Sequence, residues 1–156
     1  MKTVTIGKKE IVLKEEWIIG FVTTWIVGLL AHAYRFFNFL PIWDSIYNFT
    51  GVGSTYTLGR WFLGYAGLIT SMFDLPWING AFSLFYISIV VILVTEIFEI
   101  KNKGMIALCA ALFVSFPTVV SSFAYMYTAD AYLLAFLLST VAIYLTWRVR
   151  KWGMIA

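Results

Sequence analysis

The sequence predicts an all-α membrane protein: a polytopic bundle of four transmembrane helices, with an interfacial helix in the first outer loop. Two observations on composition support this fold class. Of the 156 residues, 62% are hydrophobic and only 12% are charged, whereas soluble domains average about 25% charged residues. The mean hydropathy is +0.87. The third observation is that most lysines and arginines lie in alternate segments between the apolar runs. We expect residues 1–156 to form a single transmembrane domain.

Four apolar segments are long enough to cross a bilayer, which takes roughly 20 mainly apolar residues. In chain order they are Trp17–Ala33, Trp77–Ile97, Gly104–Phe123 and Ala129–Trp147. Pro117 lies in the third segment and predicts a kink or the outer end of that helix, because proline lacks a backbone donor. Residues 31–33 also resemble a signal-peptide cleavage site. Glu15 and Glu16 directly precede the first apolar run, and they favour a transmembrane helix instead.

The basic residues predict the orientation of the chain in the membrane. They precede the first span, separate the second from the third, and follow the fourth: Lys2, Lys8, Lys9, Lys14, Lys101, Lys103, Arg148, Arg150 and Lys151. The outer loop at 34–76 holds only Arg35 and Arg60. Because cytoplasmic loops carry the excess of lysine and arginine, the N-terminus is predicted to be cytoplasmic. The final residues resemble the start of another apolar segment, so we expect the N-terminal part of a longer protein.

The segment Trp61–Phe73 predicts a helix that lies in the outer membrane interface. Its large apolar side chains follow the spacing of one helical stripe; they are Trp61, Phe62, Tyr65, Leu68, Ile69, Met72 and Phe73. A helix of this length spans roughly 20 Å, less than the bilayer core of about 30 Å. The alternative is a short re-entrant or core helix, in which Gly64 and Gly67 would let another helix approach closely.

Several charged side chains are predicted to meet at the outer surface, and each has a chemical and a structural interpretation. Asp44 suits a general base or a hydroxyl ligand, or else a helix N-cap. Arg60 suits a phosphate, or else it extends from the interface toward water. Asp130, near Tyr127, suits a sugar hydroxyl, or else the favourable dipole at a helix start. His32 favours an interhelical hydrogen bond over chemistry.

Other classes of site have no support in the sequence. There is no basic patch for nucleic acid, no metal motif of the HExxH or paired CxxC type, no glycine-rich phosphate loop and no serine nucleophile elbow. The single cysteine, Cys109, lies in an apolar run and predicts a small buried side chain. No cofactor is expected, and the sequence does not decide whether a metal takes part.

Three stretches of the chain carry a family resemblance: WDSIYNFTGVGSTYTLGRWFLGY, DLPWINGAFS and SFPTVVSSFAYMYTADAYLLAFLLS. They resemble the N-terminal part of the GtrII-type membrane glucosyltransferases, bacterial enzymes that modify surface polysaccharides such as O-antigen. The resemblance covers nearly the whole chain and implies a fold of the GT-C class. Enzymes of this class place an acid in the first outer loop, followed by interfacial helices. Asp44 matches that acid; some relatives have an acidic pair, so Asp74 or Asp130 is left open as a second carboxylate.

The resemblance implies transfer of a sugar, expected to be glucose, from a polyprenyl phosphate in the membrane lipid to a polysaccharide outside the bacterial inner membrane. Asp44 would then be catalytic and take the proton of the acceptor hydroxyl. Arg60, with Arg35, would stabilise the leaving phosphate. The remaining substrate-binding candidates are Asp130, Tyr127 and His32.

Two rival functions are compatible with the composition. A non-catalytic four-helix scaffold or assembly subunit would need neither Asp44 nor Arg60. A flippase or small transporter would favour polar residues at mid-membrane, where the spans contain few beyond Thr23, Thr24 and Ser88. The scarcity of such residues counts against transport.

Overall fold

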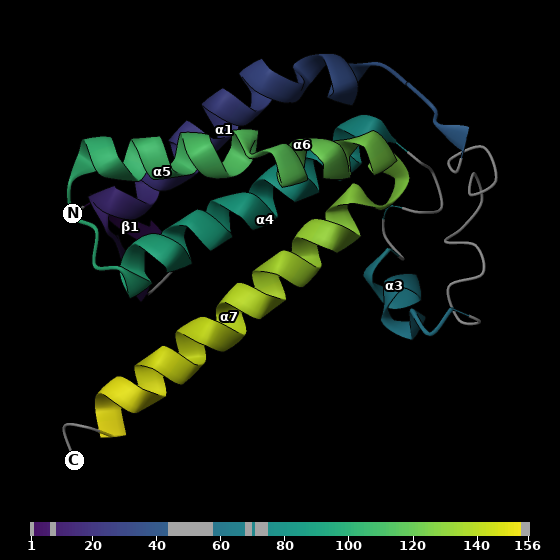
Figure 1. The fold of residues 1–156 in the computed structure, drawn as a ribbon. Helices are drawn as coiled ribbons and strands as arrows, with labels where there is room; N and C mark the ends of the chain where they lie inside the picture. The colour runs from purple at the N-terminus through teal and green to yellow at the C-terminus, as the bar shows by residue number, and fades with distance from the viewer. Residues whose placement is uncertain (1, 7–8, 44–57, 68–69, 71–74, 154–156) are drawn as a thin grey trace.

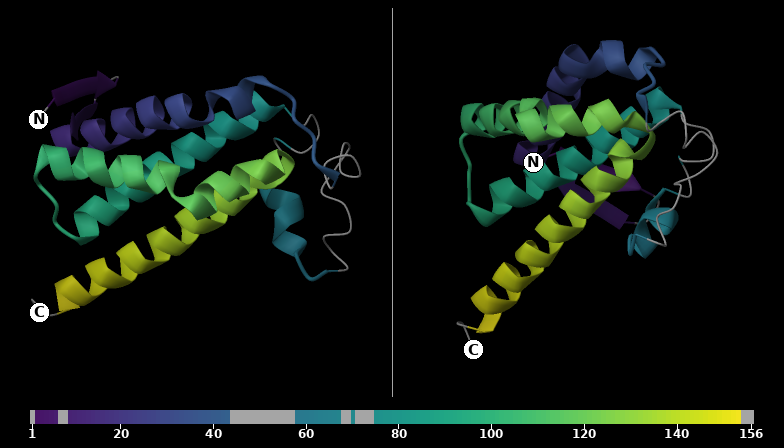
Figure 2. Two further views of the ribbon diagram at one scale, coloured as in Figure 1. Left: turned by 45° about the horizontal axis from the view of Figure 1, so that its top comes forward. Right: turned by 45° about the vertical axis from the view of Figure 1, so that its right-hand side comes forward.

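The computed structural model describes residues 2–6, 9–43, 58–67, 70 and 75–153. Its elements are β1 (Lys2–Ile6), β2 (Lys9–Leu13), α1 (Glu15–Phe37), α3 (Trp61–Ala66), α4 (Pro76–Ile97), α5 (Lys103–Ser115), α6 (Pro117–Ser122), the 3-10 helix η1 (Phe123–Thr128) and α7 (Ala129–Gly153). The α1 helix runs away from the hairpin, α4 returns, α5 and α6 run outward again, and α7 returns (Figure 1). The end of α7 therefore lies opposite α3 (Figure 2).

Within the described residues, three helical segments are long and apolar enough to cross a membrane: Glu15–Phe37, Pro76–Ile97 and Lys103–Arg150. The third segment joins α5, α6, η1 and most of α7, and the ribbon reverses its direction between α6 and α7 (Figure 1). The predicted helical membrane protein is thus confirmed in its class. Four separate crossings stay a prediction, as does the interfacial position of the helix in the outer loop.

The all-α prediction omitted a two-stranded hairpin at the N-terminus. The strands β1 and β2 are antiparallel, and their register pairs Lys2 with Leu13 and Ile6 with Lys9. Polar and apolar residues alternate along β1, which is a strand pattern. This segment is charged and precedes the first apolar run, so hydropathy alone predicted no element there.

Local sequence signals set where the helices begin and end. Pro76 opens α4, where proline is favoured because its missing N–H would be unpaired in the first turn. Asn102 caps α5, since its side-chain oxygen accepts a hydrogen bond of 3.1 Å from the Met105 backbone N–H. The α5 helix ends at Ser115 and α6 begins at Pro117, so the break expected at Pro117 is present.

The central helix is α4, which packs against α1, α5 and α7. The buried face of α1 repeats every fourth residue: Gly20, Thr24, Gly28, His32 and Phe36. Around these faces lies one apolar core, made of Phe36, Leu84, Ile87, Val91, Ala110, Val114, Val119, Phe123, Met126, Ala129 and Leu133. The core extends to the chain reversal after α6, so packing in the bundle positions the polar residues near it.

The hairpin end of the bundle is joined by ion pairs between helices. Glu96 at the end of α4 accepts hydrogen bonds from Lys14 Nζ at 2.7 Å and from Trp17 Nε1 at 2.8 Å. Lys103 at the start of α5 pairs with Glu15 of α1. Both pairs are partly exposed, so each contributes little to stability. The acids and bases at this end therefore contact one another.

Candidate functional site

Asp130 is a buried carboxylate in the first turn of α7. Only 3% of the surface of Asp130 is exposed. Oδ2 accepts a hydrogen bond of 2.6 Å from the hydroxyl of Thr70, which lies between α3 and α4. Oδ1 is buried and has no hydrogen-bond partner among the described residues. A buried carboxylate with an unused oxygen is costly unless it serves a ligand or a proton, so Asp130 is the strongest candidate in the described part.

Further polar atoms without partners lie close to the reversal that precedes Asp130. Asn79 and Ser83 are completely buried on α4, and Thr128 is buried in η1. The Asn79 Oδ1, Ser83 Oγ and Thr128 Oγ1 atoms have no hydrogen-bond partner among the described residues. Asn79 Nδ2 donates to the carbonyl oxygen of Met126 at 2.8 Å, one helical turn before Asp130. The junction of α4 with α7 is therefore polar inside an apolar bundle.

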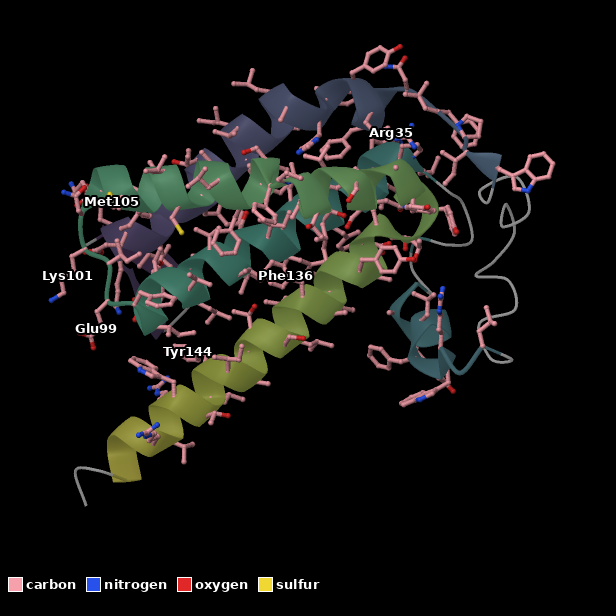
Figure 3. The ribbon with its side chains drawn as sticks, viewed as in Figure 1. Arg35, Glu99, Lys101, Met105, Phe136 and Tyr144 are labelled. Carbon is pink, nitrogen blue, oxygen red and sulfur yellow. The ribbon has the colours of Figure 1, made fainter. Side chains whose placement is uncertain are left out.

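Arg35 lies at the last turn of α1, at the opposite end of the bundle from Glu99 and Lys101 (Figure 3). Its Nε donates to the Phe123 carbonyl oxygen at 2.9 Å, and its Nη2 donates to the Ala124 carbonyl oxygen at 2.6 Å. The same side chain lines a small cavity with Tyr127. Two of the predicted substrate residues are thus brought together, with Arg35 bonded to backbone.

His32 occupies the interior of the bundle. It is 5% exposed, and its Nε2 lies 2.9 Å from the Val114 carbonyl oxygen on α5. The imidazole packs against the ring of Phe123, with 4.6 Å between centroids. This is the interhelical hydrogen bond that the sequence favoured, and the histidine supports the α5–α6 segment from α1.

Arg60 precedes α3, and its side chain is exposed. The α3 helix contacts α7, yet none of its six residues is buried. Trp61 and Tyr65 are each about three-fifths exposed, at 61% and 60%, and Phe62 is 46% exposed. An arginine beside exposed aromatic rings is the composition expected at a membrane interface. The rest of the predicted helix, at 68–69 and 71–73, lies outside the described residues, as do Asp44 and Asp74.

A groove of about 970 Å³ lies between the α5–α6 arm and α7. It is lined mainly by apolar side chains, with hydroxyl groups toward α6; the lining is Leu112, Phe113, Phe116, Thr118, Val119, Ser121, Ser122, Tyr125, Tyr132, Leu133 and Phe136. The volume lies within the range of small-molecule sites. Its chemistry suits a hydrocarbon chain with a polar end. In the described part of the chain, no three His, Cys, Asp or Glu side chains are grouped to hold a metal.

Removing the Thr70 hydroxyl is expected to destabilise the protein. Thr70→Val would leave Asp130 Oδ2 buried without this donor, and the free energy of unfolding should fall by about 1 kcal/mol. Thr70→Ser keeps the hydroxyl and should retain most of the stability. Thermal unfolding of the purified protein in detergent measures both variants. A valine variant as stable as the wild type, beside a serine variant that loses stability, would show that the threonine methyl group, and not the hydrogen bond, stabilises the fold.

Thr70, Asn79 and Ser83 were absent from the sequence-based candidates. A signal for Asn79 was present, because a polar side chain within an apolar span is a site hypothesis by default. Thr70 is sixty positions from Asp130 in the chain, and no local pattern connects the two residues. Their contact depends on the tertiary fold, which brings Thr70 to the first turn of α7.

The chain was compared with known proteins in three ways. Residues 33–156 match a family model described as "Glucosyl transferase GtrII". No match was found among curated proteins or among solved structures. The matched region includes α3, the groove, the chain reversal and Asp130. Since the match extends over far more than half of the sequence, the chain belongs to the glucosyl transferase GtrII family.

Proposed function

We propose that the protein moves a sugar, glucose, from a polyprenyl-phosphate donor to a cell-surface polysaccharide at the extracytoplasmic face of a bacterial inner membrane. The observation that carries this proposal is the GtrII family match over residues 33–156. Glycosyl transfer by a member of this family needs a site for an activated sugar and an acceptor hydroxyl. The described residues supply features that fit a lipid-linked donor.

The apolar groove supports a donor with a hydrocarbon tail. Leu112 and Phe116 come from the α5–α6 arm, and Leu133 and Phe136 come from α7. A polyprenyl chain would fill this groove and bury apolar surface on both sides. The hydroxyl-bearing end near Tyr125 would then lie toward the phosphate and the sugar.

Three residues are proposed for the reacting groups. Arg60 would stabilise the leaving phosphate through charge-assisted hydrogen bonds, which its exposed guanidinium is free to reorient to make. Asp130 would accept a hydrogen bond from a sugar hydroxyl at Oδ1, the oxygen that Thr70 does not bond. Asp44, outside the described residues, would take the proton of the acceptor hydroxyl. Tyr127 and His32 would lie beside the bound substrate and complete its binding site.

The distribution of charge supports the proposed orientation. Lys14, Lys101, Lys103 and Arg148 belong to the hairpin end of the bundle. Because lysine and arginine are retained on the cytoplasmic side, this end would face the cytoplasm. The end with α3 and the chain reversal would then face outward, where surface polysaccharides are found.

The choice of donor tests the proposal. Membranes containing the protein, and matched membranes lacking it, would receive an acceptor polysaccharide with either polyprenyl-phosphate [14C]glucose or a [14C]glucose nucleotide. We expect label in the polysaccharide only with the lipid-linked donor and only when the protein is present. Transfer from the nucleotide sugar in membranes free of the lipid donor would contradict the proposal.

A further inference from the structure

The chain reversal between α6 and α7 interrupts the regular α-helical hydrogen bonding of the backbone, although the Ala129 N–H still donates to the Met126 carbonyl oxygen. Tyr125 in η1 has φ −97° and ψ 59°, which are not helical values. At such a break, nearby carbonyl groups need donors from elsewhere, because buried backbone oxygens are rarely left unpaired. The residues concerned lie immediately before the turn that carries Thr128 and Asp130.

Side chains from two other helices supply those donors. Arg35 of α1 bonds the carbonyl oxygens of Phe123 and Ala124, at 2.9 and 2.6 Å. Asn79 of α4 bonds the Met126 carbonyl oxygen at 2.8 Å. Three carbonyl groups within four consecutive residues are therefore fixed from both sides of the reversal. Figure 3 shows Arg35 at this end of the bundle, where α1 ends beside α6.

We propose that Arg35 and Asn79 are positioning residues for glucosyl transfer: they hold the α6–α7 reversal so that Tyr127 and Asp130 meet the substrate. This inference rests on the proposed function for its catalytic consequence. Its structural basis is separate, since the three hydrogen bonds stand without any substrate. It differs from the sequence-based role of Arg35 as a ligand of the leaving phosphate.

The geometry of the guanidinium favours positioning over phosphate binding. Arg35 uses Nε and Nη2 on two neighbouring carbonyl oxygens, which takes the forked arrangement of donors that only arginine has. A lysine at this position would keep the positive charge but has a single nitrogen, which does not reproduce the fork. The conservative variant Arg35→Lys therefore separates the two roles. It keeps the charge that attracts a phosphate, but it loses the pair of hydrogen bonds to the backbone carbonyl groups.

The first measurement is steady-state glucosyl transfer from polyprenyl-phosphate glucose by Arg35→Lys and Arg35→Gln. We expect both variants to lose kcat by a similar factor, about tenfold to a hundredfold, with the KM for the donor unchanged. If instead the lysine variant keeps wild-type kcat while the glutamine variant has a higher donor KM, Arg35 binds the anion directly and the inference is wrong.

The second measurement is amide hydrogen exchange, which needs no substrate. Arg35→Lys and Asn79→Leu should both speed exchange at residues 123–130, since each removes side-chain hydrogen bonds that hold carbonyl groups of the reversal. Lys103→Gln is the control, because it removes a contact between two helices at the other end of the bundle, where Lys103 pairs with Glu15, and should leave exchange at 123–130 unchanged. Unchanged exchange at 123–130 in both variants would overturn the inference. If exchange rises in the two variants as expected, but the wild-type protein shows no transfer from the lipid donor, the result contradicts the proposed function and not the structural role of Arg35 and Asn79.

Discussion

Replacing Asp44 with asparagine is expected to lower the rate of sugar transfer by about 10²–10⁴-fold. The acceptor hydroxyl must lose its proton as it attacks the sugar, and an amide is not basic enough to take it. The KM for the donor should change little, because the proposed contact is with the acceptor. Asp44 is the acid that the sequence predicts for the first outer loop, and the family match extends across it.

The assay measures initial rates at saturating donor, in membranes with equal amounts of the wild-type and variant proteins. Glu99→Gln is the matched control: it makes the same change from carboxylate to amide on an exposed residue, at the end of the bundle away from Arg35 (Figure 3). The control should transfer sugar at the wild-type rate. Wild-type activity in Asp44→Asn would remove Asp44 as the base and would leave Asp130 as the acid to examine.

Apolar length predicted the helices well where one helix fills one span. The expected segment Trp77–Ile97 corresponds to α4, Pro76–Ile97, because a continuous apolar run with a proline at its start leaves little choice of boundary. The first segment ended at Ala33, whereas α1 continues to Phe37. Hydropathy falls at His32 and Arg35, but both side chains find carbonyl partners on other helices, and the helix continues.

The third span shows what apolar length leaves out. Gly104–Phe123 was expected as one span, with either a kink or the outer end of its helix at Pro117, and the structure divides it into α5 and α6. The local effect of Pro117 was predictable because it depends on the residue itself. The 3-10 turn that follows was not, because Arg35 and Asn79 stabilise it from distant parts of the sequence.

For the candidate site, the sequence predicted which end of the bundle the residues occupy, but it did not predict their hydrogen-bond partners. Asp130, Arg35 and Tyr127 were expected at one end of the bundle, and the structure places them around the chain reversal at that end. The family resemblance assigned Arg35 to the leaving phosphate, whereas its described donors bond backbone carbonyl groups. Charge predicts the kind of partner that a side chain attracts, but the fold determines which partners lie within hydrogen-bonding distance.

Gly80 is the position in α4 where the addition of one methyl group should have the largest effect on stability. A Cβ atom there would lie 2.6 Å from Phe36 Cδ1, 2.7 Å from Cγ and 2.9 Å from Cε1. The ring cannot move away freely, because it packs edge-on against Phe123, with 5.1 Å between centroids, and is 3% exposed. Overpacking of this kind costs about 1–3 kcal/mol, offset by about 0.5–1 kcal/mol from the better helix propensity of alanine.

We therefore expect Gly80→Ala to lower the free energy of unfolding by about 2 kcal/mol, the upper end of overpacking less the propensity gain, measured by thermal unfolding in detergent. Gly20→Ala on α1 is the matched control, since its nearest neighbour, Val91 Cγ1, would be 3.4 Å away, an ordinary contact. That variant should be as stable as the wild type or slightly more so. A second substitution, Phe36→Leu, should recover part of the loss, because the two residues share one contact. Equal stability of the two alanine variants would mean that α1 and α4 are packed less closely at Gly80 than the structure has them. The adjacent residue, Asn79, would then lack the rigid support that its hydrogen bond to Met126 requires.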